Sequence, residues 1–451
     1  MAAWRWVGWV VSAVVVLGGS ACGTARPLDA TMPHDRFASL PPETAQRLAE
    51  KAAWHEDRIG RRHLTSTGVL AYQADVRRVD GDAAPMAYAD MAIWTGMYVA
   101  AESMRYLVTA DPDAIDRLDR AIDGLTLLHQ VTNTPGFPAR AVQRPTDPHD
   151  ASVYWVVGSG RFSEYRWLGD TSVDQVLGLL YGYGWAFDAT DDATRRRRVA
   201  ADVTAIVDRL VAHGMQIVGA DGRRVKHGDL TAGLFAENLN ALIALALVKT
   251  AAHVAPDGPY ERIYRDLAER KGYARRALAA RDRWWEFVTG VNHSDNNLAV
   301  LAYDALLRYE RDPRLRDLYH AGLRRTWNVA SREGNALMTG IAVAHGVPVD
   351  QTAVRAAIAS LVDFPLEQRD VEVMNSRRAD VCVAHRRDRT GDLQACAPLP
   401  MSERPRGPFE WNQNPYRLDR SGRGELEFSG LGYLVAYWLG RHVEFIEAPS
   451  P

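Results

Sequence analysis

The sequence has no excess of charge of either sign. It carries 54 Lys and Arg residues against 56 Asp and Glu residues, a formal net charge of -2, and its longest basic run is Arg195 to Arg198. A protein that binds nucleic acid would gather Lys and Arg on one surface. The arginine run follows Asp191 and Asp192 at an expected helix start, so we interpret it as a solvated helix face. No nucleic-acid partner is predicted.

Several motifs of well-defined chemistry are also missing. The chain has no glycine-rich phosphate loop, no G-x-S-x-G elbow, no H-E-x-x-H pair and no dinucleotide fingerprint between a strand and a helix. Its apolar helical segments lack the aspartate cluster that a metal-dependent enzyme acting on a lipid or terpenoid needs. We therefore predict no cofactor and no metal site, and no partner protein can be inferred.

The N-terminus has the parts of a secretory signal. Arg5 supplies a positive charge, residues 7–19 are apolar, and small residues end the segment. This stretch is shorter than the about 20 residues that span a bilayer. Cys22 follows, as in a lipoprotein signal, so we expect an exported protein anchored by a lipid on Cys22 at the periplasmic or cell-surface side. Gly19 stands where a large aliphatic residue is usual, which leaves export without lipidation as an alternative.

The remaining chain divides into a tether and one domain. Residues 1–21 are the expected signal peptide, residues 22–41, rich in Pro, Thr and Ala, a tether, and residues 42–447 the folded domain. Cys382 and Cys396 lie close together in a polar segment. In an oxidising compartment we expect them to form a disulfide, with two unrelated thiols as the alternative.

Helical patterns of two kinds dominate the domain. One kind is apolar nearly all round, as expected of a helix buried on every side, and the other is amphipathic. The first kind covers residues 89–108, 173–189, 233–252, 296–309, 336–345 and 428–442. The second covers residues 112–129, 193–213, 261–281, 313–330 and 350–362, with residues 43–60 as a sixth.

The two kinds alternate along the chain. Asp111 and Asp312 precede prolines at the starts of two amphipathic segments, a pattern typical of helix N-caps. Repeated units of this kind bury their faces on one another. We therefore predict an all-α (α/α)6 toroid, an inner ring of helices wrapped by an outer ring, with an open helical solenoid as the alternative.

Three segments carry a family resemblance: "ADMAIWTGMYVAAESMRYLVTADPDA", "GDTSVDQVLGLLYGYGWAFDATDD" and "FEWNQNPYRLDRSGRGELEFSGLGYLVAYWLGRH". They resemble an exported bacterial family of six-hairpin toroid proteins, over most of the mature chain. More distantly, the hairpin pattern is similar to six-hairpin glycosidases, including unsaturated-glucuronyl hydrolases, and to toroid polysaccharide lyases. This resemblance implies the toroid fold and supports function only by analogy. No catalytic motif matches residue by residue, so no residue role is carried over.

The first candidate site lies where an apolar helix is expected to begin. Asp170 and Asp174 are four residues apart, so on a helix they would share a face, and Gln175 follows. Two carboxylates beside a sugar bond can act as proton donor and base when their environments separate their pKa values. The alternative is a capping box of Ser172 and Gln175, with both acids favouring the positive helix end.

Two further polar groups precede apolar helices. His293 and Asp295 could form an acid–base pair with Asn296 beside it to bind hydroxyls, and a polar helix cap is the alternative. The second group could bind a sugar through a carboxylate, an indole, two amides and a guanidinium. In this group Arg417 could hold the carboxylate of a uronic acid. A structural role for the aromatics is equally open. This second group comprises Glu410, Trp411, Asn412, Asn414 and Arg417.

Other candidate substrate-binding residues are polar or aromatic side chains at positions that a central cleft would expose. They are Trp94, Tyr98, Glu102, Tyr165, Arg166 and His227. Glu102 lies in an apolar helix, where it is either paired with an arginine or functional.

From this pattern we predict a glycan-active enzyme, a glycoside hydrolase or a polysaccharide lyase that uses acid–base catalysis. Glycans with and without uronic acid are both open as substrates. A non-catalytic envelope lipoprotein that binds glycan or peptide is the alternative.

Overall fold

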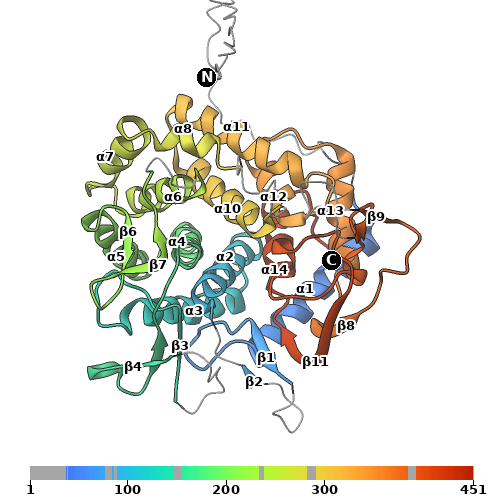
Figure 1. The fold of residues 1–451 in the computed structure, drawn as a ribbon, viewed down its shortest axis with the longest axis horizontal. Helices are drawn as coiled ribbons and strands as arrows, with labels where there is room; N and C mark the ends of the chain where they lie inside the picture. Colours follow the sequence, from blue (N-terminus) through green and yellow to red (C-terminus); the bar gives the residue numbers. More distant parts are fainter. Residues whose placement is uncertain are drawn as a thin grey trace, which may run out of the picture. The chain divides into compact units, whose positions relative to one another are not determined.

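Six helices that are buried nearly all round form the inside of the domain (Figure 1). Each packs against the next along the chain, and the last returns to the first, so they close a ring. The computed structural model thus confirms the predicted toroid and excludes an open solenoid. The inner helices are α2 (Met91–Thr109), α4 (Val173–Asp188), α6 (Asn238–Val254), α10 (His293–Tyr309), α12 (Ala336–Ala344) and α14 (Leu431–His442).

The structure describes residues 37, 39–76, 84–85, 89–145, 154–232, 238–281, 291–383 and 393–449. The predicted signal peptide, Cys22 and nearly all of the predicted tether lie outside them. Within this described part, no helix is both long and apolar enough to cross a membrane.

An outer layer of amphipathic helices covers the ring. Each packs on the inner helix before it in the chain, except that α1 packs on α14. The predicted single helix over residues 261–281 is wrong: it breaks into α7, a π-helical turn and α8 because Gly272 adopts a left-handed conformation with φ 73°. The outer elements are α1 (Pro42–Arg62), α3 (Pro112–Gln130), α5 (Ala193–Ala212), α7 (Tyr260–Arg265), the π-helix η2 (Asp266–Arg270), α8 (Tyr273–Leu278), α11 (Pro313–Ala330) and α13 (Gln351–Asp363).

The two ends of the chain build one hairpin, because α1 belongs to the outer layer beside α14. Tyr433 of α14 donates a hydrogen bond to the carbonyl of Leu48, at 2.7 Å. Arg58 and Arg62 of α1 both donate to the buried carboxylate of Glu427, at 2.6–3.0 Å. The ring is therefore closed by contacts between segments that are far apart in sequence.

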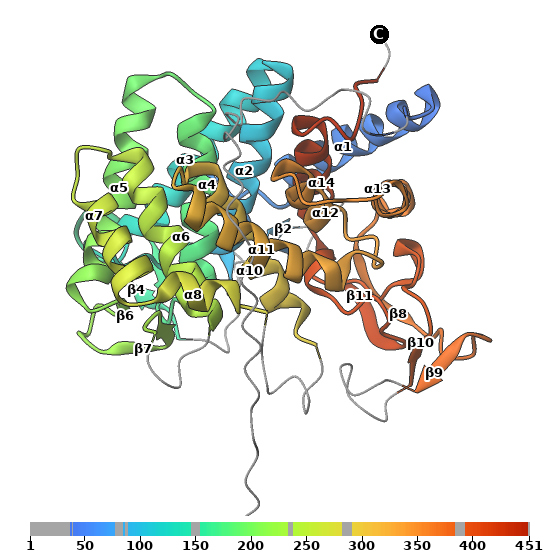
Figure 2. The same ribbon diagram turned by 90° about the horizontal axis from the view of Figure 1, so that it is seen from above.

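The connections at the two ends of the ring differ greatly in length. Turns from inner to outer helices span at most six residues. The reverse connections are longer, apart from the five residues between α11 and α12, and they carry the strands that the structure describes (Figure 2). The strands form small antiparallel sheets. The long connections therefore gather at the N-terminal ends of the inner helices. The strands are β1 (Gln73–Asp75), β2 (Ala84–Pro85), β3 (Ala141–Gln143), β4 (Val156–Val157), β5 (Arg166–Leu168), β6 (Gln216–Val218), β7 (Arg224–Asp229), β8 (Arg369–Val373), β9 (Val381–Val383), β10 (Leu393–Ala395) and β11 (Arg420–Phe428).

A disulfide joins Cys382 of β9 to Cys396, directly after β10. The predicted pairing of these two cysteines is therefore present in the structure. It closes the hairpin that these two short strands form.

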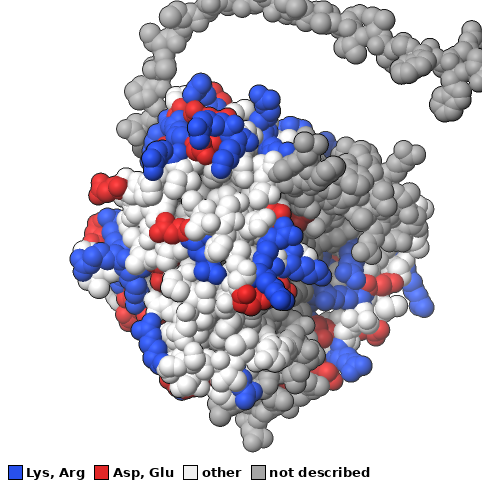
Figure 3. Space-filling model, turned by 60° about the vertical axis from the view of Figure 1, so that its left-hand side comes forward, with Lys and Arg blue, Asp and Glu red and all other residues white. Residues whose placement is uncertain are grey.

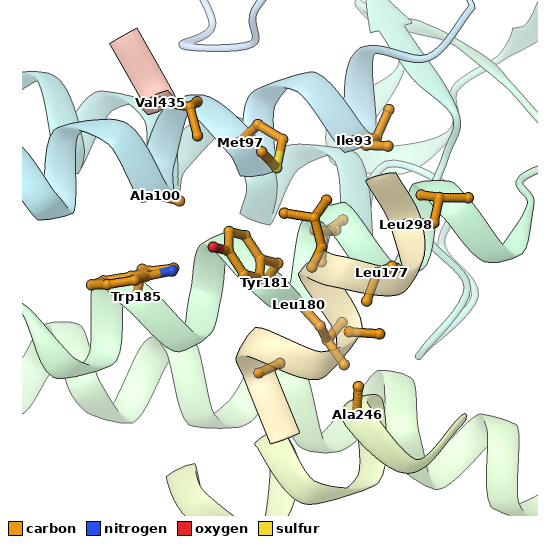
Figure 4. Packing of buried hydrophobic residues seen from close by; sticks show 14 of the residues in the cluster. Ile93, Met97, Ala100, Leu177, Leu180, Tyr181, Trp185, Ala246, Leu298 and Val435 are labelled. Atoms are coloured by element: carbon orange, nitrogen blue, oxygen red, sulfur yellow. The ribbon is translucent and has the colours of Figure 1, made fainter. Parts of the chain in front are cut away.

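The middle of the ring is filled by side chains. Met97 of α2 and Tyr181 of α4 lie across from each other between the inner helices, and Leu298 of α10 lies farther along the same hydrophobic cluster (Figure 4). All three are buried. In the part of the chain that the structure describes, the interior of the ring is therefore a packed hydrophobic core.

The inner helices α2 and α4 approach each other backbone to backbone. A Cβ atom on Gly96 would lie 2.0 Å from the carbonyl oxygen of Gly178, and one on Gly182 would lie 2.3 Å from the carbonyl oxygen of Gly96. Real Cβ atoms do not come so close to another atom. These glycines therefore set the spacing of the two helices.

The outer surface shows no large area of one charge on the face that Figure 3 presents. There, Lys and Arg side chains are interspersed with Asp and Glu and separated by broad uncharged areas. In the region of α7 and η2, Arg265 pairs with Glu261 and Glu269, and Arg270 pairs with Asp266.

A buried pair of carboxyl groups lies in the wall between α1, α2 and α14. Glu102 is fully buried, and Arg105 lies 3.3 Å from Glu102 and 3.7 Å from Glu56. Trp438 donates to the other oxygen of Glu56 at 3.0 Å. Burial, and then the charge of Glu56, raise the pKa of Glu102 well above its usual value. Glu102 and its fully buried neighbour Tyr98 thus lie in the wall, away from the long connections, and their role in substrate binding stays a prediction.

The Glu102→Gln variant should change how stability depends on pH. Because the folded-state pKa of Glu102 is raised, its proton stabilises the fold at low pH, and this contribution is lost as pH rises. Gln keeps the shape of the protonated carboxyl and does not titrate. The variant should therefore gain Tm relative to the wild type between pH 5 and pH 9. A Tm difference that stays constant over this range would contradict the assignment.

Candidate active site

The N-terminal ends of the inner helices bring polar side chains together under the long connections. Helix N-termini carry unpaired N–H groups and a positive partial charge, which favour carboxylates and polar ligands. Asp90 precedes α2, Asp174 lies in the first turn of α4, and His293 begins α10. This end of the ring is therefore where the candidate active site is built.

Two carboxylates share one amide at the start of α2 and α4. The Nε2 atom of Gln175 donates to Asp90 at 2.9 Å and to Asp174 at 3.2 Å. Both carboxylate oxygens lie within 3.2 Å of the same nitrogen, so they are at most about twice that distance apart. The Oε1 atom of Gln175 accepts from the backbone of Ile93 at 3.1 Å, which fixes the amide in place. Gln175, a predicted site residue, therefore holds this pair together.

Arg140 fixes Asp90 from the other side. It donates to the Asp90 carboxylate, to the Asp170 carbonyl at 3.1 Å and to the Ser172 hydroxyl at 3.2 Å. Burial raises the pKa of Asp90, the charge of Arg140 opposes the shift, and the charge of Asp174 adds to it. The pKa of Asp90 thus depends on two charged neighbours, Arg140 and Asp174, as well as on burial.

The predicted pairing of Asp170 with Asp174 is wrong. Asp170 is exposed and has φ 53°. Arg140 donates a hydrogen bond to its backbone carbonyl and not to its side chain. It lies before the helix, which begins at Val173, so the two acids do not share a helix face. Asp90 takes the place that Asp170 was expected to fill.

Glu410 is a buried carboxyl group without a described partner. It is 6% exposed, and neither of its oxygens makes a hydrogen bond with the described residues. Burial raises its pKa to about 7, and Arg406 opposes this shift. Its short helix, η4 (Glu410–Asn412), packs on α10. A carboxyl group with this pKa is about half protonated at neutral pH, whereas an ordinary glutamate is ionised there.

The residues on both sides of Glu410 hold it in position. Phe409 stacks on Trp94 of α2 with ring centroids 4.8 Å apart, and Trp411 donates from Nε1 to the carbonyl of Gly432 at 2.8 Å. A Cβ atom on Gly432 would lie 2.3 Å from a carboxylate oxygen of Glu410, so α14 approaches the carboxyl group closely. Trp94 and Trp411 are both buried. They pack around Glu410, and their predicted contact with a sugar stays a prediction.

The start of α10 adds buried polar groups beside η4. The ring of His293 lies 3.8 Å from the Glu333 carboxylate, so the structure pairs it with Glu333 in place of the predicted Asp295. Residues two apart on a helix point in different directions, which explains the change. Asn296 is buried next to it. Asn297 is also buried, and neither atom of its amide has a hydrogen-bond partner among the described residues.

The other predicted binding residues have varied positions. Asn412 lies beside Glu410, and its buried amide oxygen has no partner in the described part of the chain. Asn414 accepts from the backbone of Tyr416 at 2.9 Å and so shapes a turn. His227 and Arg417 are exposed, and Tyr165 is half-buried under Arg144 at 5.4 Å. The described residues contain no group of three or more His, Cys, Asp or Glu side chains arranged to hold a metal ion.

Sequence analysis missed the role of Asp90. An acid before an apolar helix suggests a simple N-cap, yet Asp90 has φ 73° and its side chain makes no capping hydrogen bond. The available signal was its position: Asp90 and Asp174 both stand at the start of neighbouring apolar helices.

No protein-family model matches the chain, and no curated protein matches it. Among solved structures it is similar to a glycoside hydrolase family 9 protein of Bacteroides ovatus, with 11% identity, 89% of this chain and 83% of that chain covered, and a TM-score of 0.44. It is also similar to an unsaturated glucuronyl hydrolase specific for heparin, with 10% identity, 89% and 97% covered, and a TM-score of 0.46. A family 76 glycoside hydrolase (mannosidase) from Bacteroides thetaiotaomicron has 10% identity, 89% and 98% covered, and a TM-score of 0.46.

Proposed function

We propose that this chain is an exported glycoside hydrolase whose general acid is Glu410. The observation that carries the proposal is the state of that carboxyl group: it is buried, has no described hydrogen-bond partner, and has a pKa of about 7. Leaving a buried polar group unpaired costs stability, so its retention calls for a functional reason. A protonated carboxyl at the mouth of a ring is suited to donate a proton to a leaving oxygen.

The carboxylates of Asp90 and Asp174 supply the second half of the mechanism. As the bond between C1 and the glycosidic oxygen breaks, the oxygen takes the proton of Glu410. A carboxylate then either bonds to C1 or removes a proton from the water that attacks it, and positive charge on the sugar is stabilised by the same pair. Asp174 is assigned this role, because Gln175 binds both acids but Arg140 binds only Asp90 and neutralises part of its charge.

The test is a cleavage screen with the full chain purified in detergent. Acidic and neutral polysaccharides are incubated with the wild type, and both new reducing ends and absorbance from unsaturated uronates are followed. We expect reducing ends without that absorbance. The Asp174→Asn and Asp90→Asn variants should each lower kcat by roughly 10²-fold or more, because a charge used in the transition state is lost.

Asp170→Asn is the matched control, because this carboxylate is exposed and lies next to the same helix. It should retain wild-type activity. Unsaturated products would show a lyase in place of a hydrolase. Binding without cleavage in every preparation would favour the non-catalytic alternative.

The enzyme is proposed to act outside the cytoplasm, attached through Cys22, as the N-terminal sequence predicts. This part of the proposal is supported by the sequence alone.

A further inference from the structure

A second unpaired polar group lies in the sheet beside the carboxylate pair. Gln143, the last residue of β3, is 2% exposed. Neither its amide oxygen nor its amide nitrogen has a hydrogen-bond partner among the described residues. A buried primary amide can accept two hydrogen bonds and donate two, and leaving all of them unmade is costly. The amide is therefore poised for a ligand.

The sheet register places a cation next to this amide. The strand order is β3-β5-β4, and Arg166 of β5 is directly opposite both Gln143 of β3 and Val157 of β4. Residues directly opposite in an antiparallel pair project from the same face. Arg166 is half-buried and makes no ion pair or side-chain hydrogen bond with any described residue. Gln143, Arg166 and Val157 thus form one row, which we call the Gln143 row.

The Gln143 row becomes more open from one strand to the next. Gln143 is buried, Arg166 is half-buried and Val157 is 66% exposed. A ligand could therefore enter over β4 and reach the guanidinium and then the amide. The outer end of the row is therefore the end that solvent and ligands can reach.

The row is connected to the candidate catalytic residues through the strands β3 and β5. Arg140, which binds Asp90, immediately precedes β3, and its backbone N–H donates to Leu168 at the end of β5, at 2.9 Å. Gln143 and Arg166 are two residues farther along these strands than the Ala141–Leu168 pair, which is about 7 Å of strand. That distance is comparable with the spacing of neighbouring sugars in a polysaccharide chain.

We propose that the Gln143 row is a substrate subsite for a sugar that carries a carboxylate, next to the point of cleavage. A guanidinium binds a carboxylate with two parallel hydrogen bonds, and a primary amide can both donate to and accept from hydroxyl groups. A neutral sugar would leave Arg166 without an anionic partner. The inference rests on the proposed function, because it names the substrate class of the same site.

The test measures binding separately from catalysis. Affinity gel electrophoresis of the full chain in detergent would use polygalacturonate, alginate, hyaluronan and heparin, each beside its carboxyl-reduced form. The wild type and Glu410→Gln should be retarded by at least one native polymer and much less by its reduced form. Arg166→Leu should weaken this binding at least tenfold, and Arg166→Lys should restore part of it because the charge remains without the bidentate geometry.

Gln143→Leu separates a binding role from a structural one. It should weaken binding several-fold while its Tm stays the same or rises, because an unpaired buried amide is replaced by an apolar side chain of similar size. Loss of binding together with a large fall in Tm would overturn the assignment of Gln143. Arg197→Leu is the control for loss of an arginine, because Arg197 is exposed on the outer helix α5; it should bind as the wild type does.

Other outcomes overturn the subsite directly. They are equal binding to native and carboxyl-reduced polymers, no binding to any of them, or unchanged binding by Arg166→Leu. Carboxyl-reduced heparin keeps its sulfate groups. If it is the only reduced polymer that still binds, the site recognises sulfate, and this result would also overturn the proposal. Arg166-dependent binding without cleavage would refute the proposed hydrolase activity but support the subsite. Cleavage with no preference for carboxylate-bearing polymers would support the hydrolase activity but refute the subsite.

Discussion

Replacing Glu410 with Gln is expected to lower kcat by roughly 10²- to 10⁴-fold, the usual contribution of a general acid. Gln has nearly the same shape but no proton to transfer. The wild-type rate should fall as pH rises above about 7, because burial raises the pKa of Glu410 to about 7 and the acid then loses its proton. The measurement is kcat against pH for both proteins on the polysaccharide found in the screen. Any residual activity of the variant should lack this decline.

The same substitution should alter stability in a defined direction. The pKa of Glu410 is raised from 4.5 to about 7, so its protonated form stabilises the fold at low pH and this stability is lost as pH rises through 7. A shift of this size corresponds to roughly 3 kcal/mol. Glu410→Gln should therefore gain stability relative to the wild type between pH 4.5 and pH 8, measured by denaturant unfolding.

Glu372→Gln is the control for both measurements, because Glu372 is exposed on β8 in the same long connection. It should match the wild type in rate and stability. Full activity in Glu410→Gln would remove Glu410 from the mechanism. A similar loss in Glu372→Gln would show that the connection as a whole, and not one proton, is required.

The Gly96→Ala variant is expected to be destabilised by more than about 4 kcal/mol, a size reserved for severe packing defects. Helix propensity alone predicts the opposite sign, since Ala is favoured over Gly by about 1 kcal/mol in a helix interior. The added Cβ would lie 2.0 Å from the backbone of Gly178, so α2 and α4 would have to separate. Thermal and denaturant unfolding measure which effect is larger.

Gly169→Ala is the matched comparison for Gly96→Ala. A Cβ atom there would meet only Trp167, at 3.6 Å, an ordinary contact. Its Tm should stay close to that of the wild type. A Gly96→Ala protein as stable as Gly169→Ala would show that α2 and α4 are not as close as described.

The ring of helices could be predicted because its signals are local. Apolar and amphipathic segments alternate, and the expected caps are present: Asp111 accepts from the backbone of Asp113, and Asp312 accepts from Arg314, both at 2.9 Å. The break at Gly272 could not be predicted with the same certainty, because a glycine inside a helical pattern is often tolerated.

The candidate site could be predicted only in part, because its chemistry depends on contacts between distant segments. Asp174, Gln175 and Glu410 were found as polar residues before apolar helices. The partner of Asp174 is Asp90, whose position next to it depends on the packing of α2 on α4. The raised pKa of Glu410 arises from burial against α10 and α14, which no short stretch of sequence records.

The hairpin made from α1 and α14 has a consequence for the order of folding. Leu48 and Tyr433, which bond across it, are 385 residues apart. The equilibrium cost of closing a loop grows only slowly with its length, but non-local contacts slow folding strongly. During synthesis, α1 emerges before the other helices of the domain, whereas α14, the inner helix that it covers, emerges last. The ring therefore cannot close on a growing chain, and its final closure has to follow the synthesis of α14.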